Sequence, residues 1–239
     1  MQPIVPTLYL IPNTVAEESP DVVFPKYNRQ IIHQLKYFIA EDAKSCRRLL
    51  KTLDYPDIAG AVIEEYSEHD IEKDPYEYLN PLLGGNSVGL ISDAGCPAVA
   101  DPGEQIVFAA HQKKINIQAL IGPSSILLSV MQSGLSGNSF AFNGYLPIES
   151  SDKIKKIKEL EILSYNKKQS QFFIETPYRN EKLFSLLLNT LHPATALSVN
   201  CNLLAQHTIS KTYYVSDWKK QKMPDIQKKP CVFGLMKAK

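Results

Sequence analysis

The chain has 239 residues, of which 44% are hydrophobic and 21% are charged, the composition of a folded protein with a sizeable core. Disordered, collagen-like and small disulfide-stabilised chains are therefore excluded. No apolar run approaches the ~18 residues that a membrane-spanning helix needs, and the first residues lack the pattern of a secretory signal. We therefore expect a soluble protein with no membrane partner.

The net charge of +1 hides two halves of opposite sign. Residues 1–120 carry 10 basic and 17 acidic side chains, a net charge of −7, whereas residues 121–239 carry 16 and 8, a net charge of +8. Such asymmetry is typical of two domains and suggests a polyanionic partner for the second half. Two solvated surfaces of opposite charge would explain the counts equally well.

The cysteines are far apart and form no C-x-x-C pair, and the five histidines show no spacing typical of a metal site. We therefore expect four free, buried thiols, a reducing cytoplasmic compartment and no bound metal. The four cysteines are Cys46, Cys96, Cys201 and Cys231.

The first half alternates strand-like and helix-like patterns, which is typical of an α/β protein. The third strand, after the Gly84-Gly85-Asn86 turn, is a continuous apolar run and is predicted to be buried on both faces. The predicted strands are residues 7–11, 37–40, 88–91 and 115–121, and the predicted helices are residues 41–53 and 102–112.

The second half continues the alternation. Gly122 and Pro123 are predicted to open its first helix, with proline at the first helical position, where a missing N–H costs nothing. We place the domain boundary here, which gives two α/β domains, residues 1–121 and 122–239. The strands predicted after it are 139–145, 170–175, 196–199, 211–215 and 231–236, and the helices are 152–165 and 179–191.

The most informative segment follows the strand at residues 88–91. Asp101 is predicted to be the N-cap of the next helix, with Pro102 at its first position and Glu104 completing a capping box. Helix initiation does not explain the loop Asp93-Ala94-Gly95-Cys96-Pro97 before it. Ligands bind beyond the carboxyl ends of strands in open α/β sheets, where small residues allow close approach. The loop is therefore a candidate ligand site, with Asp93 as an acceptor for an amine or a ribose hydroxyl, and a plain tight turn is the alternative.

Several common motifs are absent from the sequence. It contains no G-x-G-x-x-G after the first strand, no G-x-x-x-x-G-K-[ST] and no G-x-S-x-G. A dinucleotide fingerprint, a P-loop and a hydrolase elbow are therefore excluded, and a nucleotide-like ligand must be held in another way.

A second group of polar residues lies where the strand at 37–40 passes into a helix. Glu41 and Asp42 are acidic and lie at the predicted start of the helix, where negative charge interacts favourably with the helix dipole, and Arg47 and Arg48 follow them. Most such patterns are simply well-made helices. A carboxylate at the end of a strand can nevertheless reach a cleft and act as a base.

Two basic segments lie in the second half. In residues 152–158, Ile154 and Ile157 are predicted to face inward, with Lys155 and Lys158 on one outer side; residues 219–229 hold five lysines. Solvated lysine surfaces are common, so contact with nucleic acid is the less frequent interpretation of these segments alone.

Taken together and in order, five segments resemble one family. The chain is similar to the tetrapyrrole methylase-type (class III) S-adenosylmethionine-dependent methyltransferases, and within them to the 16S rRNA (cytidine 2′-O) methyltransferases. The match extends over about residues 37–190. The segments are AEDAKSCRRLL (Ala40–Leu50), SDAGCPAVADPG (Ser92–Gly103), GPSS (Gly122–Ser125), FNGYLP (Phe142–Pro147) and ETPYR (Glu175–Arg179).

The resemblance implies two α/β domains with S-adenosylmethionine in the cleft between them, in a homodimer. It also implies that the cofactor is held largely by the protein backbone. By motif matching, the cofactor-binding residues are Asp93, Ala94, Gly95, Cys96, Pro97, Val99, Ser124, Ser125 and Thr176.

The sequence departs from the family pattern mainly in segments that face the substrate. The glycine-containing loop expected after the first strand reads Ile11-Pro12-Asn13-Thr14-Val15, and Cys96 replaces a threonine. The departures on the substrate side are Ala43-Lys44 for threonine and arginine, Ile148-Glu149 for basic residues, and Val199-Asn200-Cys201-Asn202 where a late R-E-L-T-K-like signature is expected.

Methyl transfer to a ribose 2′-hydroxyl of ribosomal RNA is thus the function that the resemblance favours. Glu41 or Asp42 would act as the base, and Arg47 and Arg179 would hold phosphate. Two alternatives stay open: a methylase of a tetrapyrrole-like small molecule, with Tyr9, Tyr145 and Tyr178 lining its cleft, and a non-catalytic nucleotide- or RNA-binding relative.

Overall fold

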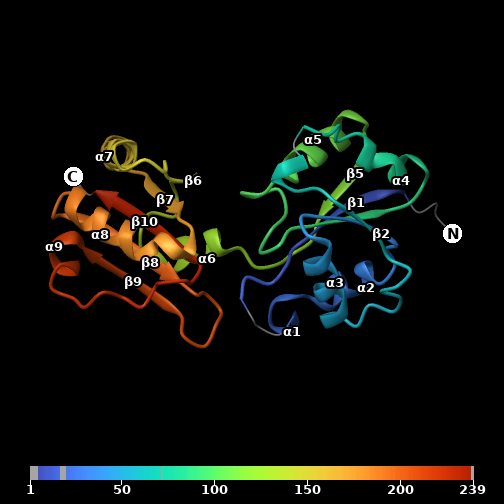
Figure 1. Ribbon diagram of the computed structural model, residues 1–239, viewed down its shortest axis with the longest axis horizontal. Coiled ribbons are helices and arrows are strands. Elements are labelled where there is room, and N and C mark those ends of the chain that lie inside the picture. The colour runs from blue at the N-terminus through green and yellow to red at the C-terminus, as the bar shows by residue number, and fades with distance from the viewer. Residues whose placement is uncertain (1–4, 17–19, 71, 238–239) are drawn as a thin grey trace. The chain divides into compact units, whose positions relative to one another are not determined.

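The computed structural model describes residues 5–16, 20–70 and 72–237 (Figure 1). The chain divides into two compact units, Met1–Ser124 and Ser125–Lys239. The boundary expected from sequence, between residues 121 and 122, lies three residues before this division. None of the helices described is long and apolar enough to cross a membrane.

The first unit is built on a five-stranded parallel sheet. Its order is β3-β2-β4-β1-β5, so β1 lies between β4 and β5. The connection from β1 to β2 therefore runs toward one edge of the sheet and that from β4 to β5 toward the other. The strands are β1 (Thr7–Ile11), β2 (Tyr37–Ala40), β3 (Val62–Glu65), β4 (Val88–Ile91) and β5 (Asn116–Ala119).

Helices cover both faces of this sheet, because alternate strand residues point to opposite sides. On one face, Ile11, Phe38 and Ile91 pack with α2 (Lys26–Ile32) and α3 (Ala43–Thr52). On the other face, strand residues including Leu8, Ile39 and Leu90 pack with the second group of helices. This group comprises α4 (Asn80–Leu83), α5 (Glu104–Gln112) and a 3-10 turn (Glu77–Leu79), while a short α1 (Pro20–Val23) and a 3-10 turn (Glu68–Asp70) lie elsewhere along the chain.

The second unit holds a mixed five-stranded sheet of order β6-β7-β10-β8-β9. Strands β6 and β7 pair in parallel, whereas β10, at the centre, is antiparallel to both of its neighbours, and β8 is antiparallel to β9. The strands are β6 (Phe140–Tyr145), β7 (Ser170–Ile174), β8 (Thr195–Cys201), β9 (Ile209–Tyr214) and β10 (Cys231–Lys237).

The larger core of this unit lies between one face of the sheet and α7, α8 and α9, with Phe173, Phe233 and Trp218 among its members. A smaller cluster of Val130, Phe172 and Val232 packs α6 on the opposite face. The helices are α6 (Ser125–Ser133), α7 (Ser150–Lys167), α8 (Asn180–Thr190) and α9 (Val215–Trp218), with a 3-10 turn at Pro177–Arg179.

The predicted fold class, two α/β units, is confirmed, and so is the burial of β4 on both faces. Two predicted helix starts are wrong. Helix α5 begins at Glu104 with Gly103 as its N-cap, and α6 begins at Ser125 rather than at Pro123. All four cysteines are free thiols, but Cys96 is only half-buried, which corrects the expectation of four buried ones.

Candidate functional site

Two loops are joined at the carboxyl edge of the first sheet, directly after β1 and β4. Asn13 is 6% exposed, and its backbone N–H donates to the Gly95 carbonyl at 2.8 Å while the Gly95 N–H donates to the Asn13 carbonyl at 3.2 Å. The Asn13 side-chain amide also donates to the carbonyls of Ser92 (3.0 Å) and Asp93 (3.1 Å). The shape of the Asp93–Pro97 loop is therefore set by a residue that sequence reasoning treated only as a departure.

This edge is also where the sheet changes the direction of its connections. Strands β1 and β4 are neighbours, and the chain leaves them toward opposite edges of the sheet. In open α/β sheets, ligands bind in the crevice that such a switch point leaves beyond the strand ends. The loop that the sequence singled out thus lies at the position where this fold class binds ligands.

The loop after β5 closes the same arrangement from a third direction. A Cβ atom at Gly122 would lie 2.1 Å from Cγ of Pro12, so only glycine fits against the loop after β1. The Cys96 thiol donates to the Pro123 carbonyl at 3.4 Å. Gly122 and Pro123 therefore belong to this three-loop cradle, which explains why they do not start a helix.

The backbone of the second loop is held in unusual conformations. Gly95, Ala98 and Ala100 have φ values of 72°, 61° and 60°, and left-handed conformations cost alanine about 1–2 kcal/mol each. Asp101 Oδ1 accepts the N–H groups of Ala98 (3.0 Å) and Gly103 (2.8 Å), so Asp101 stabilises this loop instead of capping α5. Backbone strain of this kind clusters at ligand-binding sites.

Asp93 is an exposed carboxylate with a perturbed titration. The pKa of Asp93 is raised above its ordinary value, mainly because the carboxylate is partly desolvated, and the negative charge of Asp42 adds to this shift. A hydrogen bond from Ser45 and the positive charge of Arg48 act in the opposite direction and lower the pKa. Ser45 also donates its N–H to Asp42 at 3.0 Å and accepts a hydrogen bond from Arg48 at 3.4 Å, so Ser45 connects the polar side chains at the start of α3. Burial alone raises the pKa of the Cys96 thiol in the same loop.

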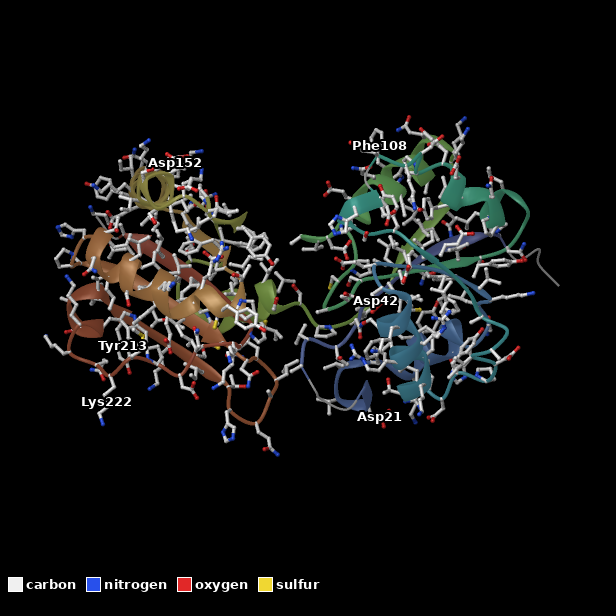
Figure 2. All side chains as sticks on the ribbon, viewed as in Figure 1. Asp21, Asp42, Phe108, Asp152, Tyr213 and Lys222 are labelled. Atoms are coloured by element: carbon white, nitrogen blue, oxygen red, sulfur yellow. The ribbon has the colours of Figure 1, made fainter. Side chains whose placement is uncertain are left out.

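Asp42, labelled in Figure 2, is the N-cap of α3. Its two carboxylate oxygens accept the N–H groups of Lys44 (3.1 Å) and Ser45 (3.0 Å). Glu65, at the end of β3, accepts the N–H of Ala43 at 2.9 Å. Helix capping therefore accounts for the position of Asp42 without any catalytic role.

The remaining predicted residues of this helix differ in their surroundings. Glu41 is half-buried at the end of β2, and Arg47 is exposed. Arg48 and not Arg47 is the arginine whose charge acts on Asp93, and its guanidinium donates to the Ser45 hydroxyl at 3.4 Å. The i,i+3 spacing from Asp42 to Ser45 and from Ser45 to Arg48 is the sequence signal for this chain of contacts.

In the second unit, Thr176 lies two residues after Ile174, the last residue of β7. Its N–H donates to Glu175 Oε1 at 2.9 Å and its carbonyl accepts the N–H of Arg179 at 2.9 Å. Glu175 Oε2 pairs with Lys153 Nζ at 2.5 Å, and the two side chains are 3% and 10% exposed. Sequence reasoning missed Lys153 because lysine is rarely buried. Ser125, the first residue of α6, uses its carbonyl to accept the Ser129 hydroxyl at 2.7 Å.

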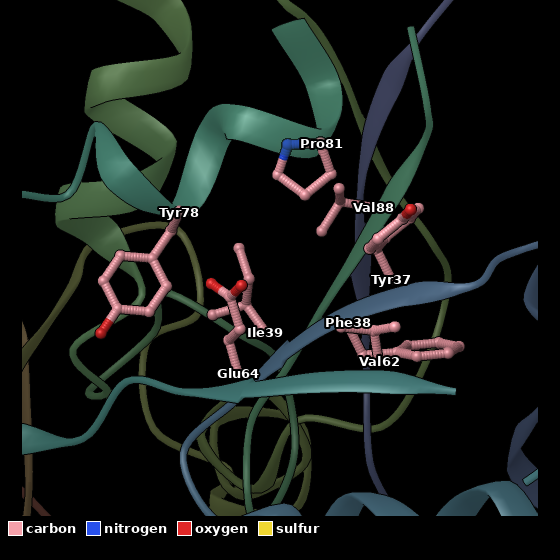
Figure 3. Close-up of a pocket in the computed structure, with 8 residues that line it drawn as sticks. All are labelled: Tyr37, Phe38, Ile39, Val62, Glu64, Tyr78, Pro81 and Val88. Carbon is pink, nitrogen blue, oxygen red and sulfur yellow. The ribbon is translucent and has the colours of Figure 1, made fainter. Parts of the chain in front are cut away.

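A separate pocket lies at the opposite, amino ends of β2, β3 and β4 (Figure 3). Most of its walls are apolar core side chains, and Glu64 is the only carboxylate among them, so it lacks the polar groups of the cradle. Its lining residues are Tyr37, Phe38, Ile39, Val62, Glu64, Tyr78, Pro81 and Val88. In the described part of the chain, no three histidine, cysteine, aspartate or glutamate side chains cluster as they would around a metal ion.

A parallel sheet with three loops that converge at its switch point is the arrangement at which open α/β folds bind ligands. The chain is similar over most of its length to curated proteins named ribosomal RNA small subunit methyltransferase I. That of Halalkalibacterium halodurans is 28% identical over 207 residues, which cover 87% of this chain and 65% of the relative.

Two further relatives carry the same name. That of Streptococcus pyogenes serotype M3 is 30% identical over 173 residues, and that of Vibrio cholerae is 28% identical over 174 residues. These matches cover 72% and 73% of this chain but only 56% and 57% of the relatives. The chain thus spans less than two thirds of the length of these relatives. No family model matches it.

Proposed function

We propose that this chain is an S-adenosylmethionine-dependent methyltransferase that acts on ribosomal RNA, at a ribose 2′-hydroxyl. The observation that carries the proposal is the cradle at the switch point, formed by the segments SDAGCP and GPSS through which the chain resembles such enzymes. Similarity to three proteins named ribosomal RNA small subunit methyltransferase I supports the same function.

The chemistry of the cradle suits this cofactor. The Asp93 carboxylate can accept an ammonium or a ribose hydroxyl, and Val99, which is 49% exposed, offers apolar surface to a purine. The small residues Ala94 and Gly95 let a ligand approach the loop closely, and the hydrogen bonds of the loop with Asn13 keep it preorganised. We assign Asp93 to Pro97 and Val99 to the cofactor on these grounds.

The other cofactor residues rest on the resemblance. Ser124 and Ser125 match the serines of the GPSS segment, and Thr176 matches the end of its strand. We assign Thr176 to the cofactor on the resemblance alone, because its N–H, its carbonyl and, at 3.5 Å, its hydroxyl are all hydrogen-bonded within the turn.

When bound, the cofactor supplies a methyl group on a positively charged sulfur. The task of the chain is to hold the acceptor oxygen ~3 Å from that carbon in line with the breaking carbon–sulfur bond, and to exclude water. The hydroxyl proton passes to a carboxylate as the oxygen–carbon bond forms. We assign the base to Glu41, with Asp42 holding the start of α3, and assign phosphate contacts to Arg47 and Arg179.

We also propose, on the resemblance alone, that the protein is a cytoplasmic homodimer.

Calorimetry with S-adenosylmethionine tests whether the chain binds this cofactor. The variant Asp93→Ala is compared with Asp57→Asn, a control on an exposed loop of the same unit. We expect the first change to weaken binding by about tenfold, the worth of one charge-assisted hydrogen bond, and the second to leave it unchanged.

Transfer of a labelled methyl group to small ribosomal subunits and to 16S rRNA transcripts tests the acceptor. A 2′-O-methyl group blocks alkaline cleavage at the modified nucleotide, so a gap in the hydrolysis ladder locates it. Absence of cofactor binding would favour a non-catalytic relative. Cofactor binding without transfer to RNA would favour a small-molecule acceptor.

A further inference from the structure

An exposed tyrosine lies two residues beyond Thr176, in the turn that follows β7. Tyr178 is 69% exposed, and Arg179 beside it is exposed as well. Aromatic side chains are costly to leave in water, and an exposed one beside cations is typical of surfaces that stack nucleic-acid bases.

The turn is held firmly by the loop before β10. The N–H of Lys228 donates to the Pro177 carbonyl at 3.0 Å, and the side-chain amide of Gln227 donates to the Tyr178 carbonyl at 3.2 Å. The buried Asn180 amide donates to the carbonyls of Ile226 (3.2 Å) and Lys229 (2.7 Å). The backbone that carries Tyr178 is thus tied on both sides, which lowers the entropy lost when a ligand binds.

The same loop brings positive charge to the turn. Lys229 pairs with Asp225 at 2.6 Å, but no carboxylate among the residues described lies within ion-pair distance of Lys228. The φ value of Lys228 is 59°, an uncommon conformation that its backbone hydrogen bond to Pro177 maintains. Lys228, which is bonded through its backbone to the turn, and Arg179, which belongs to it, are both exposed, and neither has an ion pair among the residues described.

We propose that Tyr178, Arg179 and Lys228 form a platform for single-stranded RNA, in which an unpaired base stacks on Tyr178 and Lys228 contacts a backbone phosphate. The proposal rests on the proposed function, since it places the acceptor strand next to Thr176. Unpaired bases suit an exposed ring because their faces are free, whereas the bases of a duplex are stacked on each other.

Binding of a fluorescent single-stranded RNA of about 12 nucleotides, measured by anisotropy, tests the platform. We expect Tyr178→Ala to weaken binding by about tenfold, as the loss of one stacked base implies, and Tyr178→Phe and Tyr178→Trp to retain it. Tyr165→Ala is the matched control, because Tyr165 is 42% exposed and lies beside Lys237, with Nζ 6.0 Å from its ring.

Two further measurements separate the roles. Lys228→Gln should make the salt dependence shallower by about 0.7 in the slope of log K against log salt, as expected for one lost phosphate contact on a single strand. Affinity for S-adenosylmethionine should stay unchanged in Tyr178→Ala, because the tyrosine is not assigned to the cofactor.

Equal RNA binding by Tyr178→Ala and the unaltered chain would overturn the platform and leave the proposed methyltransferase standing. Absence of RNA binding by the unaltered chain would overturn it too. Normal RNA binding without binding of S-adenosylmethionine would instead contradict the proposed function and leave the platform intact.

Discussion

At the scale of single residues, the structure separates two neighbouring carboxylates that the sequence presents as equivalent. Both side-chain oxygens of Asp42 accept hydrogen bonds from N–H groups of α3, whereas Glu41 lies directly after β2 and precedes Asp42 in the chain. A capping oxygen is recognised by local spacing, but the assignment of a base depends on where the acceptor lies. The sequence could therefore indicate that the base is Glu41 or Asp42 but could not decide between them.

The pair leads to a direct prediction. Glu41→Gln should lower turnover by about 10²-fold or more, the usual loss for a general base, with little change in cofactor affinity. Asp42→Asn should retain most turnover because asparagine caps helices nearly as well as aspartate, and Asp42→Ala should lower the free energy of unfolding by about 1 kcal/mol. Single-turnover kinetics and urea unfolding measure the two effects. A large loss of turnover in Asp42→Asn with unchanged stability would transfer the role of base to Asp42.

Asp93 should make cofactor binding depend on pH. Burial raises its pKa above the ordinary value of 3.8, so the carboxylate that we assign to the cofactor is lost as the pH falls through that raised value. Calorimetry across the acid range should show affinity falling with pH in the unaltered chain and a flatter profile in Asp93→Asn. A profile that is the same for both would exclude Asp93 as the titrating group.

The same shift has a predictable sign for stability. The folded chain holds the Asp93 proton more tightly than the unfolded chain, so the group stabilises the fold below its ordinary pKa and loses that contribution as the pH rises through the folded-state value. Asp93→Asn should accordingly cost no stability at neutral pH. A loss of stability there would mean that the carboxylate has a structural partner.

At the scale of elements, the sequence predicted what depends on local pattern. Strands such as β1 and β4 are confirmed because their apolar runs are buried. It missed β3, an edge strand whose Val62–Glu65 run reads Val-Ile-Glu-Glu and is mostly exposed.

The two helix starts were predicted wrongly because of tertiary contacts: Asp101 is hydrogen-bonded within its own loop, and Pro123 lies in the cradle. Bonds between Asn13 and Gly95 join residues 82 positions apart, which no local signal encodes.

The ion pair between α7 and the end of β7 should be important for stability. Lys153→Met leaves Glu175 as a buried, unpaired carboxylate and should cost about 3–5 kcal/mol of unfolding free energy, and the double variant with Glu175→Gln should recover much of it. Lys155→Met is the control on the same helix, because its pair with Asp152 is 78% and 56% exposed and should contribute less than about 1 kcal/mol. Similar losses in both single variants, measured by urea unfolding, would contradict the assigned burial of the pair.

At the scale of the whole molecule, the charge asymmetry follows the structural division. Residues 121–124 carry no charge, so the units ending at Ser124 and starting at Ser125 hold the same −7 and +8 as the two halves of the sequence. Each unit also has its own sheet and its own core clusters. Because the two units have net charges of opposite sign and each has its own core, we propose that the chain comprises two domains.

We therefore predict that residues 125–239 fold when expressed alone. The chain has one tryptophan, Trp218, which is 2% exposed in the core of this unit, so its fluorescence reports on the second unit only. The fragment should show the emission of a buried indole and lose it cooperatively in urea, at a midpoint close to that of the full chain. The control is residues 125–218, which lack the central strand β10 and should be unfolded, because removal of that strand separates β7 from β8. If Trp218 emits as a solvated indole in the fragment 125–239 but as a buried indole in the full chain, the second unit depends on the first for its folding.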